Sequence, residues 1–171
     1  MIKKREIKFK SKLENIHLVE QFVEEICDVY NINNSYFGNI LLSLIEAVKN
    51  AIIHGNKSDA SKNVTLCFES IPKGLLFEVI DEGNGFDFMQ IPDPTDLNVI
   101  FDENKGNGIY LIKSLADEIV FLDKGKKTQM TFHIASINKQ ISSERINKLN
   151  QFNNNRKIED KVRPQSSKNI E

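Results

Sequence analysis

Cysteine is scarce in this 171-residue sequence, and long apolar runs are absent from it. Cys27 and Cys67 are the only cysteines and lack metal-ligand spacing, which argues against a disulfide scaffold or a zinc module. The most apolar stretch, residues 40–53, is interrupted by polar residues and falls short of the roughly 20 residues that span a bilayer. The basic start, MIKKREIKFK, is not followed by the apolar segment of a signal peptide. We therefore expect a soluble, cytoplasmic protein that does not contact a membrane.

A strong excess of one charge is also missing. The sequence has 23 Lys and Arg residues and 24 Asp and Glu residues, which gives a net charge of -1. A general nucleic-acid binder is normally much more basic, so we expect no direct nucleic-acid partner. Residues 139–171 nevertheless carry eight basic and four acidic residues, which leaves residues 1–138 with a net charge of -5. We predict one domain over residues 1–136 and a basic, Asn-rich tail over 137–171, partly helical or disordered.

The first half of the chain contains, in turn, hydrophobic patterns typical of strands and of helices. Ile7 and Phe9, separated by lysine, indicate a short strand with one exposed face. Helical spacing then predicts helices over residues 13–30 and 35–55, with Ser35 as the N-cap and Gly55 as the end of the second. Alternation over residues 64–68 and an apolar run over 75–80 flank a turn and predict a β-hairpin.

The second half begins with glycines and prolines concentrated in residues 81–108, which predicts a long functional loop or lid. A third helix is expected from Gly108 through Leu115, followed by a hairpin with strands near residues 119–121 and 130–134. The order of elements predicts an α+β fold, a two-layer α/β sandwich. We expect a mixed, mainly antiparallel sheet covered on one face by three helices.

The first candidate motif lies at the end of the second predicted helix. Glu46, Asn50 and His54 are spaced four residues apart and should share one stripe beside the apolar face. A carboxamide oxygen such as that of Asn50 suits Mg²⁺, and a carboxylate such as that of Glu46 can accept a proton from an attacking hydroxyl. The alternative interpretation is an ordinary solvated polar stripe.

The second motif, Asp81-Glu82-Gly83-Asn84-Gly85, directly follows a buried strand. Asp81 could accept a hydrogen bond from an exocyclic amine, and the two glycines allow the backbone to approach a flat ligand. A plain tight turn uses the same residue types and is the alternative.

The third motif, residues 105–109, opens the third predicted helix. Glycines there leave backbone N–H groups free at the positive end of the helix, which favours a phosphate. Lys105 would add a flexible positive charge, although a lone surface lysine is usually only solvated.

The combination of the three motifs, in this order and around this sheet, is more specific than each alone. The sequence resembles the GHKL (Bergerat-fold) ATPases, which include the ATP-binding domains of gyrases, histidine kinases, and certain chaperones and mismatch-repair proteins. It looks most like the bacterial anti-sigma-factor serine kinases. The resemblance rests on EAVKNAIIHG at 46–55, PDPTD at 92–96 and GNGIYLIKSLADE at 106–118, and it extends over about residues 5–135.

The resemblance implies the Bergerat ATP-binding fold with ATP and Mg²⁺ as cofactors. It implies that Asn50 holds Mg²⁺, that Glu46 is the general base for a partner's serine, and that Asp81 recognises the adenine amino group. Gly83 and Gly85 would shape the adenine pocket, and Gly106 and Gly108 would let the lid wrap the triphosphate. The remaining expected nucleotide contacts are His54, Lys105, Asn107 and Ile109. Expected partners are a sigma factor, an anti-anti-sigma (STAS-type) protein and a second copy of the chain.

One departure from the family pattern concerns arginine. Family members frequently place an arginine in or beside the G-x-G box, whereas this chain has none between Arg5 and Arg145. Lys105 is then the candidate substitute.

Four hypotheses follow. The leading one is a serine/threonine protein kinase, ATP-dependent and of the GHKL type, that also acts as an anti-sigma regulator. The missing arginine motivates the second, a non-catalytic ATP-gated protein-binding switch. The ATPase part of a histidine kinase is disfavoured, because no segment upstream can supply a dimerising phospho-acceptor helix pair. A nucleotide-independent structural domain is the fourth.

Overall fold

The computed structural model of the chain describes residues 3–85, 107–133 and 150. Two 3-10 turns (Leu13–Ile16 and Asp123–Gly125) and a π-helical turn (Ala51–Gly55) accompany the regular elements. In chain order those elements are β1 (Lys4–Lys10), α1 (His17–Val29), α2 (Asn34–Asn50), β2 (Asn63–Ile71), β3 (Gly74–Asp81), α3 (Asn107–Leu115), β4 (Glu118–Leu122) and β5 (Lys127–His133). The predicted lid between β3 and α3 lies mostly outside the described residues, as does the tail, so the division at residue 136 stays a prediction.

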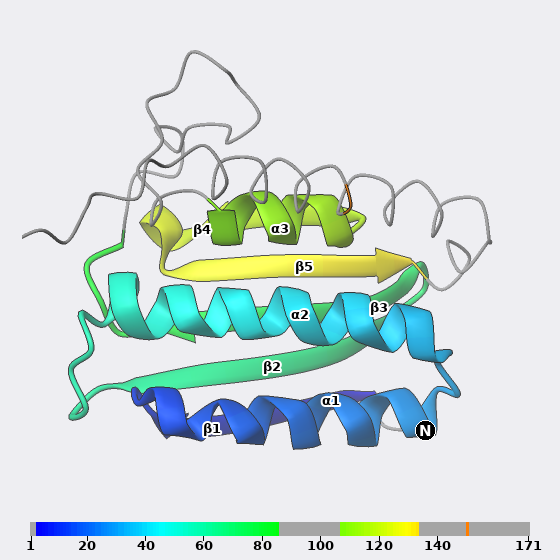
Figure 1. Cartoon of the computed structure of the whole chain (residues 1–171), viewed down its shortest axis with the longest axis horizontal. Helices are drawn as coiled ribbons and strands as arrows, with labels where there is room; N and C mark the ends of the chain where they lie inside the picture. The colour runs from blue at the N-terminus through cyan, green and yellow to red at the C-terminus, as the bar shows by residue number, and fades with distance from the viewer. Residues whose placement is uncertain (1–2, 86–106, 134–149, 151–171) are drawn as a thin grey trace, which may run out of the picture.

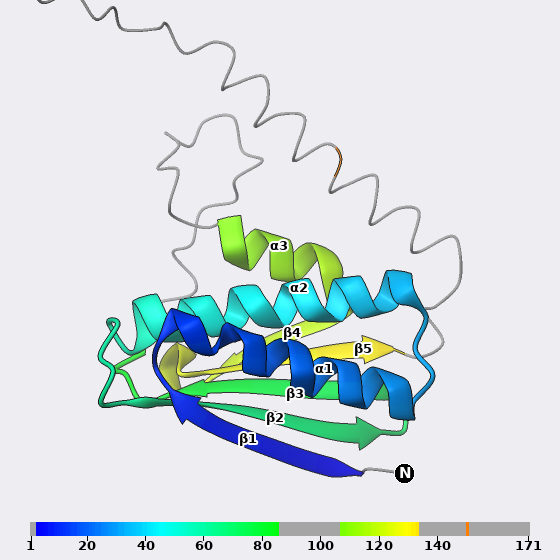
Figure 2. The same ribbon diagram turned by 60° about the horizontal axis from the view of Figure 1, so that its bottom comes forward.

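The strands form one five-stranded sheet in the order β1-β2-β3-β5-β4. All four strand pairs are antiparallel, so the described sheet contains no parallel pair and is not mixed. Figure 1 shows the sheet behind the helices, and Figure 2 shows α1, α2 and α3 together on one of its faces. The two-layer α+β architecture predicted from the sequence is therefore confirmed.

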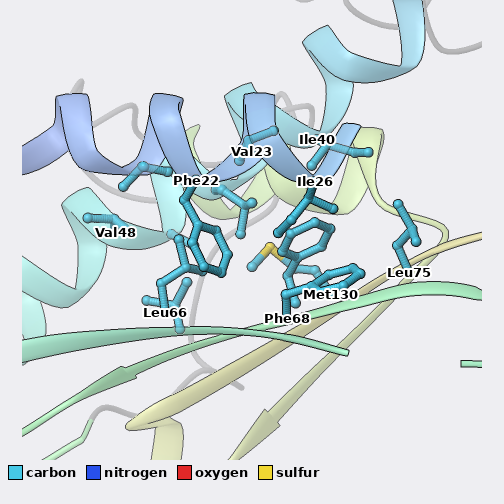
Figure 3. Close-up of a cluster of buried hydrophobic side chains, with 14 of the residues drawn as sticks. Phe22, Val23, Ile26, Ile40, Val48, Leu66, Phe68, Leu75 and Met130 are labelled. Atoms are coloured by element: carbon cyan, nitrogen blue, oxygen red, sulfur yellow. The ribbon is translucent and has the colours of Figure 1, made fainter. Parts of the chain in front are cut away.

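The core lies between the helical layer and the inner face of the sheet. Alternate residues of the central strands point into it, and Leu75, Phe77 and Val79 of β3 are at most 2% exposed. Phe68 and Phe77 from neighbouring strands meet with ring centroids 5.3 Å apart. Figure 3 shows side chains of α1 and α2 packed onto this layer, and each such buried side chain contributes about 1.5–3 kcal/mol of apolar burial.

Helix α2 begins earlier than the sequence predicts. Its N-cap is Asn33, whose Oδ1 accepts a hydrogen bond from the backbone N–H of Tyr36 at 3.0 Å, and Ser35 lies within the first turn. The assignment of Ser35 as N-cap is therefore wrong. Asparagine and serine cap equally well, so the choice depends on backbone geometry: Asn33 has the extended conformation that a cap requires.

The end of α2 changes from α-helical to π-helical geometry. The α-helical hydrogen-bonding pattern stops at Asn50, and a π-helical turn carries the chain to Gly55, the predicted end point. Together they form a 22-residue segment, Asn34–Gly55, whose most apolar 18-residue window has a mean hydropathy of 1.3, long and apolar enough to cross a membrane by length and composition alone. A core helix passes the same test, and α2 buries residues against the rest of the domain. The segment is thus weak evidence for a membrane span.

Candidate functional site

A pocket opens between α2, α3 and the sheet, at the end where β3 terminates. It has about 340 Å³ of space, including the part open to solvent. Its wall combines apolar side chains with polar groups. The lining residues are Ala47, Asn50, Ala51, Gly55, Val79, Asp81, Ile109, Ile112, Phe121, Gly125 and Thr128. Such a pocket suits a ligand with a flat apolar body and a few polar atoms.

Asp81 is the charged residue of the pocket floor. It ends β3 and is only 7% exposed. Its Oδ1 accepts a hydrogen bond from the backbone N–H of Gly83 at 2.8 Å. Burial raises the pKa of Asp81, although the Gly83 hydrogen bond opposes this shift. A carboxylate has several acceptor lone pairs, so Asp81 can accept a further hydrogen bond from a ligand.

Two glycines allow the backbone to pack against that carboxylate. A β-carbon at Gly55 would lie 2.4 Å from Asp81 Cγ, and one at Gly83 would lie 2.0 Å from the carbonyl oxygen of Gly55. Either contact is far shorter than van der Waals distance, so both positions require glycine. Gly85 has another reason to be glycine, since its φ is +81° and a β-carbon there would meet the carbonyl oxygen of Lys124.

A second cluster lies where α2 meets the first turn of α3. Glu46 and Asn50 are one helical turn apart and converge on Gly108. A β-carbon at Gly108 would lie 3.1 Å from Glu46 Oε2 and 3.4 Å from both terminal atoms of Asn50. The first turn of a helix presents unsatisfied N–H groups and a partial positive charge. A carboxylate and a carboxamide therefore face the positive end of α3, where an anion would be favoured.

The structure brings most of the predicted site residues together. Ile109 lines the pocket beside Asn50, and Asn107 is the first residue of α3. His54 is exposed and is not among the lining residues of the described pocket, so its predicted nucleotide contact stays a prediction. Lys105 and Gly106 lie outside the described residues.

Asn56 has a role that the sequence did not reveal. Its side chain is fully buried, donates to the Asn63 carbonyl at 2.9 Å and to Ser11 Oγ at 3.2 Å, and accepts from the Glu82 N–H at 2.9 Å. It therefore ties the end of α2 to β2 and to the residue after Asp81. Only its place directly after Gly55 hinted at a structural role, and the partners come from distant segments.

The described residues contain no group of three or more His, Cys, Asp or Glu side chains that could hold a metal ion. The hard donors near Gly108 are the carboxamide oxygen of Asn50 and the carboxylate of Glu46. A cation there would take its other ligands from a bound molecule or water, as Mg²⁺ usually does.

Residues 9–132 match a family model described as the histidine kinase-like ATPase domain. The chain is 29% identical over 112 residues to proteins named serine-protein kinase RsbW from Staphylococcus aureus and Staphylococcus epidermidis. Each match covers 61% of this chain and 70% of the relative.

Among solved structures, the chain is similar to the RsbU and RsbW domains of Rv1364c from Mycobacterium tuberculosis. The TM-score is 0.55 at 16% sequence identity, and the match covers 77% of this chain. The chain spans about a third of that protein's length, as the match covers 32% of it. At this identity the likeness supports the fold alone.

Proposed function

The chain belongs to the histidine kinase-like ATPase domain family, and from that premise we propose that it is an ATP-dependent serine kinase with anti-sigma activity. It would phosphorylate a serine of an anti-anti-sigma (STAS-type) protein and bind a sigma factor when that partner is absent. The name of the staphylococcal relatives supports the kinase class. The observation that carries the proposal is the convergence of Glu46 and Asn50 on Gly108 at the start of α3.

The adenine ring would lie on the floor of the pocket. Asp81 would accept a hydrogen bond from the exocyclic amine, while Val79, Ile109 and Phe121 give the ring apolar surroundings. The close packing of Gly55 and Gly83 against the carboxylate keeps Asp81 in place. A buried carboxylate that must be matched by a donor discriminates strongly against a base lacking an amine at that point.

The phosphates would extend from this floor toward α3. Backbone N–H groups in the first turn of α3 would bind phosphate oxygens, and Asn50 would contribute an oxygen to Mg²⁺. Bound ATP and Mg²⁺ would supply the phosphoryl group and neutralise part of its charge. Lys105, Gly106 and Asn107 are proposed as further contacts on the predicted lid.

Glu46 would then be the general base. Its Oε2 already points to the start of α3, where the terminal phosphate would lie. Glu46 would take the hydroxyl proton of the partner's serine as the serine oxygen bonds to the terminal phosphorus and ADP leaves. A pure binding module has no need for a carboxylate at this position.

Incubation of the protein with Mg²⁺, ATP and its cognate anti-anti-sigma protein tests the proposal. Mass spectrometry should find one phosphate on a serine of the partner with ATP, and none with ADP. The second candidate is the ATP-gated switch, which the absence of arginine between Arg5 and Arg145 favours. Release of a partner on ATP addition without any phosphoprotein would select the switch.

We also propose that the protein acts in the cytoplasm as a homodimer and contacts neither membrane nor nucleic acid. Light scattering of the purified protein and fractionation of cells would test these points. Capture of partners in ATP and in ADP, read by mass spectrometry, would identify the sigma factor and the anti-anti-sigma protein.

A further inference from the structure

We propose that Lys49 is a positioning residue for Glu46. The inference rests on the proposed function, since it concerns the residue assigned there as the general base. Lys49 Nζ donates a hydrogen bond to Glu46 Oε1 at 2.8 Å, one helical turn along α2. Among the described residues, Lys49 is the one cation that forms an ion pair with Glu46.

The two oxygens of Glu46 have different surroundings. Oε1 is held by Lys49, whereas Oε2 lies 3.1 Å from the position of a β-carbon on Gly108. A carboxylate bound through one oxygen presents the other in a fixed direction. The Lys49 hydrogen bond therefore keeps Oε2 directed at the start of α3, where the reacting hydroxyl and the terminal phosphate would meet.

The partial exposure of the Lys49–Glu46 ion pair indicates that it matters more for the orientation of Glu46 than for the stability of the fold. The Glu46 side chain is 20% exposed and that of Lys49 is 41% exposed. A partly exposed ion pair of this kind contributes little to folding stability. Small errors in the position of a catalytic group, in contrast, reduce rates strongly. Loss of Lys49 should thus affect the transfer rate far more than stability.

Lys49 acts on Glu46 and not on the adenine site in this proposal. It does not line the pocket that holds the proposed adenine site, and its hydrogen bond goes to a side chain of its own helix. Removal of Lys49 should therefore lower kcat for phosphate transfer and leave ATP affinity and the KM for the partner unchanged.

The test uses the full chain with Lys49→Gln, Lys49→Arg and the control Lys113→Gln, which removes an exposed lysine of α3. Lys49→Gln should lower kcat for transfer to the cognate anti-anti-sigma protein by about 10- to 100-fold. Lys49→Arg should restore most of the rate, because a guanidinium also donates to a carboxylate. Calorimetry with ATP and Mg²⁺ should give the same affinity for all variants, and Lys113→Gln should behave as the unmodified protein.

Three results would overturn the inference: a Lys49→Gln variant with the original kcat, a variant that loses ATP affinity while kcat is kept, or no recovery with Lys49→Arg. A crystal structure of Lys49→Gln gives a readout that needs no transfer. It should show Glu46 turned away from Gly108, and an unchanged carboxylate would contradict the inference. If the unmodified protein transfers no phosphate, the proposed function fails, and the structure of the variant still decides whether Lys49 orients Glu46.

Discussion

Gly55 and Asp81 are packed so closely that no side chain fits between them: a β-carbon at Gly55 would lie 2.4 Å from Asp81 Cγ and 2.5 Å from its Oδ2. The two residues come from the π-helical turn after α2 and from the end of β3. Their contact joins the helical layer to the sheet at the floor of the pocket. The proposed adenine site thus depends on the backbone of one element and the carboxylate of another.

Replacement of Gly55 by alanine should therefore displace Asp81. We expect Gly55→Ala to lose about 1–3 kcal/mol of unfolding free energy through overpacking. ATP affinity, measured by calorimetry, should fall at least about tenfold, or 1.4 kcal/mol. Gly38→Ala is the matched control, because a β-carbon at Gly38 has nothing within 4 Å. It should stabilise α2 by about 0.5–1 kcal/mol and leave ATP affinity unchanged. Equal behaviour of the two variants would refute the packing argument.

Removal of the Asn56 side chain should destabilise the domain. Asn56→Ala would leave the Glu82 N–H and the Asn63 carbonyl, both now bonded to it, without that partner. We expect a loss of about 3 kcal/mol in urea unfolding, because unpaired buried groups cost about 1–3 kcal/mol each. Asn34→Ala, at an exposed position in the first turn of α2, should change stability by less than about 0.5 kcal/mol. If Asn56→Ala also lost less than about 0.5 kcal/mol, the hydrogen bonds of Asn56 would not contribute to the stability of the domain.

The raised pKa of Asp81 predicts a particular dependence of stability on pH. Burial raises the pKa in the folded state above that of the unfolded chain. The contribution of Asp81 is therefore fully present below the unfolded pKa and is lost as pH rises through the folded one. Relative to Asp81→Asn, the unmodified protein should be most stable at acidic pH in urea titrations.

Asp59 provides a comparison of opposite sign. Hydrogen bonds from the Ser61 side chain and backbone lower the pKa of Asp59. Its contribution to stability should be present above the unfolded pKa and lost as pH falls through the lowered one. The same pH trend for Asp59→Asn and Asp81→Asn would show that burial does not control Asp81.

Both cysteines should react slowly in the native protein. Cys27 and Cys67 are 4% and 7% exposed. Burial, assisted by Asp28 at Cys27 and by Glu6 at Cys67, raises the pKa of each thiol to about 11. Because the thiolate is the nucleophile, labelling by iodoacetamide at neutral pH should become fast only on unfolding in urea. Rapid labelling of two thiols without denaturant would contradict this.

The hydrophobic periodicity of the sequence is sufficient to predict the two layers of the fold, the sheet and the helices that cover it. Val64, Leu66 and Phe68 alternate in the sequence and are all buried in β2, since local pattern and tertiary burial agree there. Tyr36 is also a core residue, 1% exposed, although it carries a polar hydroxyl. Its hydroxyl lies 2.8 Å from Asp117 Oδ2, a partner 81 residues away that sequence periodicity cannot reveal.

The candidate site, like the fold, was only partly predictable from the sequence. The spacing of Glu46 and Asn50 on one helix follows from sequence, because a regular α-helix relates them. Their convergence on Gly108 depends on how α2 and α3 pack, and only the structure shows it. The exposure of His54 also depends on how the helix end packs, which its spacing from Asn50 does not indicate. The ligand roles assigned to these residues stay predictions.

The central claim is that Glu46 acts as the base for transfer from ATP to a serine, and the single-turnover rate of that transfer tests it most directly. The measurement compares the unmodified protein, Glu46→Gln and the control Glu24→Gln, an exposed carboxylate of α1, with the cognate anti-anti-sigma protein. We predict that Glu46→Gln lowers the rate at least about 100-fold. ATP affinity should stay unchanged, and Glu24→Gln should transfer normally. A Glu46→Gln variant that phosphorylates the serine at the original rate would contradict the account.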